Sequence, residues 1–103
     1  MEKLEEICFE IISSVGSARS CYVEAIQKAK AKDFERAELL MKEGVDFFKL
    51  GHQVHRSLIE KEVNGEPVNF SLILMHAEDQ LMSADGFKII AEEMIDLYKV
   101  VFK

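Results

Sequence analysis

Apolar residues in the first third of the chain recur every three or four positions, while most charged residues fall between them. This spacing is typical of one face of an α-helix. It predicts a helix over about residues 3–31, with an apolar seam made of Leu4, Cys8, Ile11, Val15, Ala18, Tyr22, Ala25 and Ala29. At Gly16, beside three serines, we expect a bend or a close contact.

A second helix is predicted to begin after Asp33, because aspartate is a good N-cap residue. Its apolar stripe again steps by threes and fours, through Phe34, Ala37, Met41, Gly44, Phe48, Gly51, His55 and Leu58. A glycine inside a helix costs about 1 kcal/mol relative to alanine. At Gly44 and Gly51 we therefore expect a neighbouring helix to approach closely.

The segment VNGEPVN, residues 63–69, predicts where the second helix ends. Asn64 and Gly65 suit a helix C-cap or a turn, and Pro67 cannot continue the helix. Asn69 is the predicted N-cap of a third helix, over about residues 70–102.

The third helix is apolar in every direction near its start, where residues 72–75 read LILM. A helix that is apolar all round is buried on more than one side, whereas each helix of a three-helix monomer keeps one face in water. The pattern therefore predicts an all-α fold, an antiparallel three-helix bundle forming a single domain over residues 1–103, and association into a homo-oligomer.

Composition narrows the classes of partner. The chain is 49% hydrophobic and carries a formal net charge of −6, with no cluster of Lys or Arg. An acidic surface repels phosphate backbones and anionic lipid headgroups, so we expect neither nucleic acid nor a membrane surface as a partner. The N-terminus does not resemble a signal peptide, no apolar run is long enough to span a bilayer, and Cys8 and Cys21 suit reduced thiols in or near the core. We expect a cytoplasmic protein.

His76 and Asp79 are the candidate chemical groups of the third helix. Their spacing places them on neighbouring positions, with Gln80 beside them. The imidazole could be a nucleophile toward a phosphoryl group, His76 and Asp79 could bind a metal, or the two could form an acid–base pair. A polar helix face with a hydrogen-bonded histidine is the commoner explanation of such spacing taken alone.

Two more histidines, His52 and His55, lie three residues apart on the second helix. Neither these nor His76 has a glutamate three positions earlier, so the paired E-x-x-H motifs of a di-iron bundle are absent from the sequence. A zinc site that combines them with His76 or Asp79 is a geometric alternative to a role in helix packing or at an interface.

Several stretches, taken in order along the chain, resemble one known family. They are FEIISSVGSARS from Phe9, AIQKAKAKDFERAELLM from Ala25, GHQVHRSLIEKEVNGE from Gly51, and MHAEDQLM from Met75. The last is similar to the family pattern M-H-[AG]-Q-D-H-L-M. The chain resembles, over nearly its whole length, the IIA components of the lactose/cellobiose (N,N′-diacetylchitobiose) class of the sugar phosphotransferase system.

The resemblance implies a three-helix subunit in a nine-helix homotrimer. It implies that His76 is the phosphorylated histidine, charged by the carrier protein HPr and discharged to a cysteine of the cognate IIB component, which serves a IIC transporter of β-linked disaccharides. It places the family's metal-binding aspartate at Asp79, where three subunits would share one divalent cation, taken as Mg²⁺.

Two residues of the motif depart from the family pattern. Glu78 stands in place of glutamine and would add negative charge beside an incoming phosphoryl group unless its side chain points away. Gln80 replaces the second histidine; it can donate a hydrogen bond to a phosphoryl oxygen but cannot titrate. On the second helix, His55 and Arg56 stand where the family often has Gln-Thr.

Two other functions are compatible with these residues. One is a helical interaction or regulatory protein that has kept the fold and lost phosphoryl transfer because of Glu78 and Gln80. The other is a histidine phosphotransfer domain of two-component signalling, in which Lys and Gly usually stand where this chain has Asp79 and Gln80.

Overall fold

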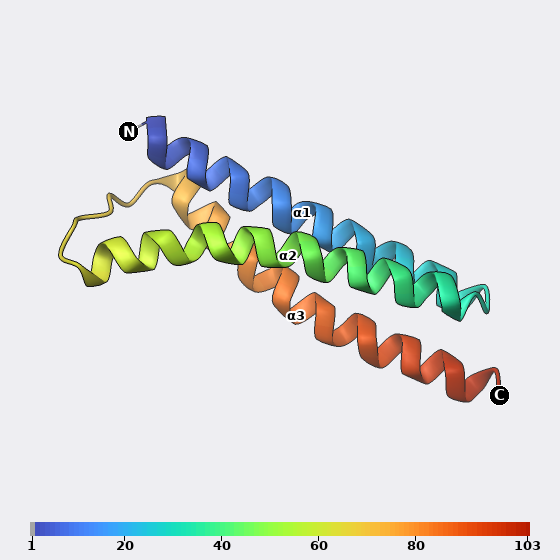
Figure 1. Cartoon of the computed structure of the whole chain (residues 1–103). Coiled ribbons are helices and arrows are strands. Elements are labelled where there is room, and N and C mark those ends of the chain that lie inside the picture. Colours follow the sequence, from blue (N-terminus) through green and yellow to red (C-terminus); the bar gives the residue numbers. More distant parts are fainter. Residues whose placement is uncertain (1) are drawn as a thin grey trace.

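The computed structural model describes residues 2–103, and the side chains of residues 3–103. Three long helices make up the fold: α1 (Glu2–Lys30), α2 (Phe34–Val63) and α3 (Leu72–Val101). They run up, down and up along a molecule 54 Å long and 20 Å across (Figure 1). The described residues contain no strand, so the all-α antiparallel bundle predicted from the sequence is confirmed at the level of one chain.

The helix ends follow the predicted capping residues with one exception. The Asp33 carboxylate accepts a hydrogen bond from the Arg36 backbone N–H at 3.1 Å. Asn64 is the C-cap of α2, and Gly65 has a φ of 84°, a left-handed conformation that glycine adopts without strain.

The prediction of Asn69 as the N-cap of α3 is wrong. Ser71 has extended backbone, and its hydroxyl accepts a hydrogen bond from the Leu74 N–H at 3.2 Å, so α3 begins at Leu72. Ser and Asn are comparable N-caps, and the choice falls on the residue whose oxygen lies in reach of the first turn. Phe70 therefore belongs to the connection, where 87% of its surface is exposed.

The two glycines inside α2 lie where α1 approaches most closely. A Cβ at Gly51 would come within 2.8 Å of Val15 Cγ1, and one at Gly44 would overlap the ring of Tyr22. The close approach predicted at both residues is confirmed. At Gly16 a Cβ would have no neighbour within 4 Å among the described residues, so of the two expectations there the close contact is not found, and the bend stays a prediction.

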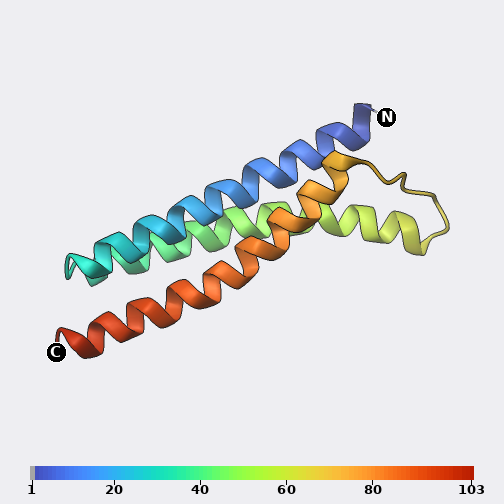
Figure 2. The ribbon, with the colours of Figure 1, turned by 180° about the vertical axis from the view of Figure 1, so that it is seen from behind.

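The core follows the predicted seam of α1. Its seam residues from Cys8 to Ala29 are fully buried, because α1 packs against both other helices while α2 and α3 touch each other much less (Figure 2). One apolar cluster joins Ile11 and Val15 to Leu58, Ala77 and Leu81. A second cluster surrounds Tyr22 and includes Leu40, Met41, Ala91 and Ile95.

Helix α3 exposes a long apolar stripe on the side away from this core. At helical spacing, Leu72, Met75, Met82, Ile90 and Leu97 are all exposed, and Met82 has 75% of its surface free. An exposed apolar surface of this length marks an interaction site in soluble proteins. Among the described helices, none is long and apolar enough to cross a membrane.

Candidate functional site

His76 lies on the second turn of α3, on a rigid part of the bundle. Buried Leu74, Ala77 and Leu81 fix this stretch of the helix against the core. The same packing leaves His76 and Asp79 exposed, with Asp79 between Met75 and Met82 on the apolar stripe. The His76 imidazole is thus exposed to solvent on a helix that packs firmly against the core.

Gln80, one turn after His76, is tied to α1. Arg19 donates a hydrogen bond from Nη1 to Gln80 Oε1 at 2.7 Å, and both side chains are partly buried. No other side-chain hydrogen bond joins α1 to α3 within the described residues. The bond fixes the position of the amide beside His76.

Glu78 points toward α2, where its carboxylate contacts His55 Nε2. The His55 side chain is 13% exposed, so the pair is partly shielded from solvent. The contact holds the Glu78 carboxylate on the α2 side of α3. His55 and Glu78 both depart from the usual family residues, and the fold pairs them with each other.

His52 takes no part in this cluster. Its ring stacks on Phe48 at a centroid distance of 6.1 Å. Residues 3–103 of one chain bring together no group of three His, Cys, Asp or Glu side chains able to hold a metal. The zinc site that would combine His52 and His55 with His76 or Asp79 is therefore not formed within the described part of one subunit.

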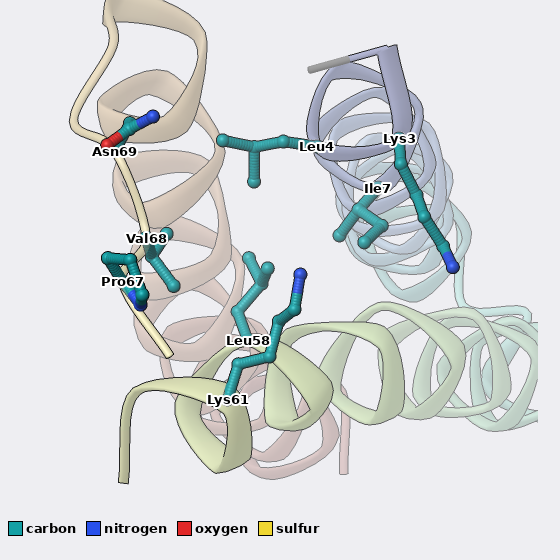
Figure 3. Close-up of a pocket in the computed structure, with 8 residues that line it drawn as sticks. All are labelled: Lys3, Leu4, Ile7, Leu58, Lys61, Pro67, Val68 and Asn69. Atoms are coloured by element: carbon teal, nitrogen blue, oxygen red, sulfur yellow. The ribbon is translucent and has the colours of Figure 1, made fainter. Parts of the chain in front are cut away.

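Two hollows flank the C-terminal half of α2. One, of about 130 Å³, lies between the start of α1, α2 and the following connection, and is walled by Leu4, Leu58 and Val68 with Lys3 and Lys61 nearby (Figure 3). The second, of about 180 Å³, lies between α2 and α3 and has His55, Met75 and Glu78 in its wall. Only the second adjoins the His76 segment.

Both cysteines are free, and burial is the main cause of the shift in their thiol pKa values. Burial, with smaller contributions from Glu78 and Glu5, raises the pKa of the Cys8 thiol. Burial followed by Glu43 and Glu24 raises the pKa of Cys21. Protonated thiols in or beside a core suit the structural role predicted from the sequence, and neither suits a nucleophile.

The sequence did not indicate the contacts of Arg19 and His55. Each joins residues on different helices, and helical periodicity specifies which residues share a face and not which residue of a neighbouring helix they meet. The available signal was indirect: Glu78 and Gln80 stand within an apolar segment, and partly buried polar groups need partners.

Comparisons with known proteins agree on one family. Residues 6–99 match the family model of the "PTS system, Lactose/Cellobiose specific IIA subunit". The oligo-beta-mannoside-specific EIIA component of Bacillus subtilis is 39% identical over 95 residues, which are 92% of this chain and 86% of that protein. The lactose-specific EIIA component of Staphylococcus aureus is 34% identical over 98 residues, 95% of each chain.

The fold of this chain also matches that of a solved relative. The crystal structure of the cellobiose-specific enzyme IIA from Bacillus anthracis superposes with a TM-score of 0.92 at 38% identity, covering 93% of this chain and 88% of that one. Family match, identity and fold thus coincide over nearly the whole chain. The chain belongs to the lactose/cellobiose-specific IIA family of the sugar phosphotransferase system.

Proposed function

We propose that this protein carries a phosphoryl group on His76, accepting it from phosphorylated HPr and passing it to a cysteine of a cognate IIB component. The observation that carries the proposal is the exposed imidazole of His76 on a packed helix, with the amide of Gln80 fixed one turn away. A IIC transporter would then use the phosphoryl group during uptake of a β-linked disaccharide. Relatives of this chain act in systems named for lactose, oligo-β-mannosides and cellobiose.

The chemistry needs little from the protein beyond position. The lone pair of an unprotonated His76 nitrogen forms the new N–P bond, while the N–P bond of the donor breaks and its electron pair returns to the donor's imidazole. Transferring phosphoryl groups are stabilised by donors and positive charge placed at their oxygens. Gln80 supplies a hydrogen-bond donor at this place, since its amide group carries two hydrogens.

The pair of His55 and Glu78 removes the objection to transfer that Glu78 raised. The carboxylate is turned toward α2 and contacts the His55 imidazole. One of the two reasons to favour a regulatory protein without phosphoryl transfer was a free negative charge beside His76, and the other was the replacement of histidine by Gln80. The contact with His55 favours the carrier.

We further propose that three subunits associate through the apolar stripe of α3 and share one divalent cation at Asp79. Carboxylate oxygens suit Mg²⁺, and one chain offers one carboxylate, Asp79, between Met75 and Met82, so the donor set fits the cation only when three copies meet. Converging carboxylates repel one another unless a cation lies between them. The cation would supply charge compensation within the assembly.

Phosphorylation by purified enzyme I and HPr tests the proposal. The protein is incubated with phosphoenolpyruvate, enzyme I and HPr, and its intact mass is measured at neutral pH and after acid treatment. We expect one acid-labile phosphoryl group on the wild type and on His52→Ala, a control that removes an exposed histidine of α2, and none on His76→Ala. A wild type that stays unmodified while HPr is charged would refute phosphoryl transfer and favour the regulatory alternative.

A further inference from the structure

Arg19 is placed to control the orientation of the amide group of Gln80. An amide side chain can present either its oxygen or its NH₂ group in a given direction, and the two choices differ by a rotation. A guanidinium carries only donors, so it can hydrogen-bond only to the oxygen. The 2.7 Å bond from Arg19 Nη1 to Gln80 Oε1 therefore leaves the NH₂ group as the free end.

The helix itself directs that free end toward His76. Gln80 is four residues after His76, and the Cα–Cβ bonds of a helix tilt toward its N-terminus. A side chain at this position leans back over the turn that carries His76. A histidine at residue 80 could donate from either ring nitrogen, whereas glutamine donates from one end only and needs a partner that selects it.

Arg19 also keeps its charge available. Within the described residues it forms no salt bridge, while Glu78 is paired with His55. The guanidinium is partly buried, and a charge in such a place is screened less by solvent than one on the open surface. A hydrogen bond from this cation polarises the Gln80 amide, so its NH₂ group becomes a better donor to a phosphoryl group on His76.

We propose that Arg19 is a positioning residue for phosphoryl transfer: it fixes the Gln80 amide so that the NH₂ group donates to the phosphoryl group on His76. The inference rests on the proposed function of His76 and adds a residue of α1 to the site. Arg19 acts through Gln80, and this separates its role from that of a general positive charge on the surface.

A double-mutant cycle on the transfer rate tests the inference. Phosphorylation by phosphorylated HPr is timed for the wild type, Arg19→Met, Gln80→Ala and the double variant, and urea unfolding of each is recorded. We expect Arg19→Met to slow transfer by about tenfold, the size expected for one lost charge-supported hydrogen bond. In the Gln80→Ala background the same substitution should have no further effect.

Two further variants separate orientation from packing and from charge. Gln80→Glu keeps a partner for Arg19, loses the NH₂ group and adds a negative charge, so it should be at least as slow as Gln80→Ala while its unfolding midpoint is retained. Arg56→Met removes an exposed arginine of α2 and should transfer at the wild-type rate.

The outcomes against the inference are distinct from those against the proposed function. If the wild type and Arg19→Met accept the phosphoryl group at the same rate, the role of Arg19 is overturned while the proposed function stands. The same holds if Arg19→Met slows transfer equally in the wild-type and the Gln80→Ala backgrounds. A wild type that accepts no phosphoryl group would overturn the proposed function and this inference together.

Discussion

The two motif residues that differ from the family pattern are each held by a residue of another helix. Glu78 pairs with His55 of α2, and Gln80 accepts a hydrogen bond from Arg19 of α1. Both contacts turn a polar group of α3 toward a defined partner. Each of the two residues that differ from the family pattern therefore has a defined partner on a neighbouring helix.

Removing His55 should slow phosphorylation because it frees the Glu78 carboxylate to turn toward the incoming phosphoryl group. Contacts of partly exposed charged groups are worth up to about 1 kcal/mol, so we expect His55→Ala to transfer up to about fivefold more slowly than the wild type. The double variant His55→Ala/Glu78→Gln should recover, because the free carboxylate is gone. Timed phosphorylation by HPr checks this, and a double variant as slow as His55→Ala would show that Glu78 is not the cause.

The buried hydroxyl of Tyr22 predicts an unusual pH dependence. It has no hydrogen-bond partner among the described residues. Burial, then Glu92, Cys21 and Asp85, raises the pKa of Tyr22 to about 12. A raised pKa in the folded state means that the stability contributed by Tyr22 is present below the unfolded pKa of about 10 and is lost as the pH rises toward 12.

Tyr22→Phe tests this reading by urea unfolding at neutral and alkaline pH. At pH 7 the substitution should leave the free energy of unfolding unchanged or raise it by about 1 kcal/mol, because an unsatisfied hydroxyl leaves the core. Above pH 10 the variant should lose less stability than the wild type. A large loss at pH 7 would mean that the hydroxyl has a partner.

At the scale of the helices, Gly44 sets the distance between α1 and α2. Gly44→Ala would drive a Cβ into the Tyr22 ring, and overpacking of this kind costs about 1–3 kcal/mol of unfolding free energy. Gly16→Ala is the matched control, since its Cβ meets nothing within 4 Å and alanine is the better helix former by about 1 kcal/mol. Thermal and urea unfolding of both variants should move in opposite directions, and a stabilised Gly44→Ala would contradict the close packing.

The helices were predictable because their apolar residues repeat over many turns. The seam of α1 from Cys8 to Ala29 and the glycines of α2 behave as their spacing indicated. The start of α3 was less predictable, since Asn69 and Ser71 are both good N-caps and local geometry selects Ser71. The partners of Glu78 and Gln80 were not predictable, because packing between helices places them.

At the scale of the whole molecule, the proposed trimer would bury the apolar stripe of α3. Met82 lies on the stripe with 75% of its surface exposed, so Met82→Glu should dissociate the assembly by placing a charge in its interface. Leu39→Glu, at an exposed residue of α2 off the stripe, is the control and should remain trimeric. Light scattering measures both, and a monomeric wild type would refute the trimer.

Locating the modified residue tests most directly whether His76 carries the phosphoryl group. The protein charged by HPr is fragmented at neutral pH in a mass spectrometer by a method that preserves the N–P bond. We expect the added mass of one phosphoryl group to lie on His76. A phosphoryl group on His52 or His55, with His76 unmodified, would contradict it.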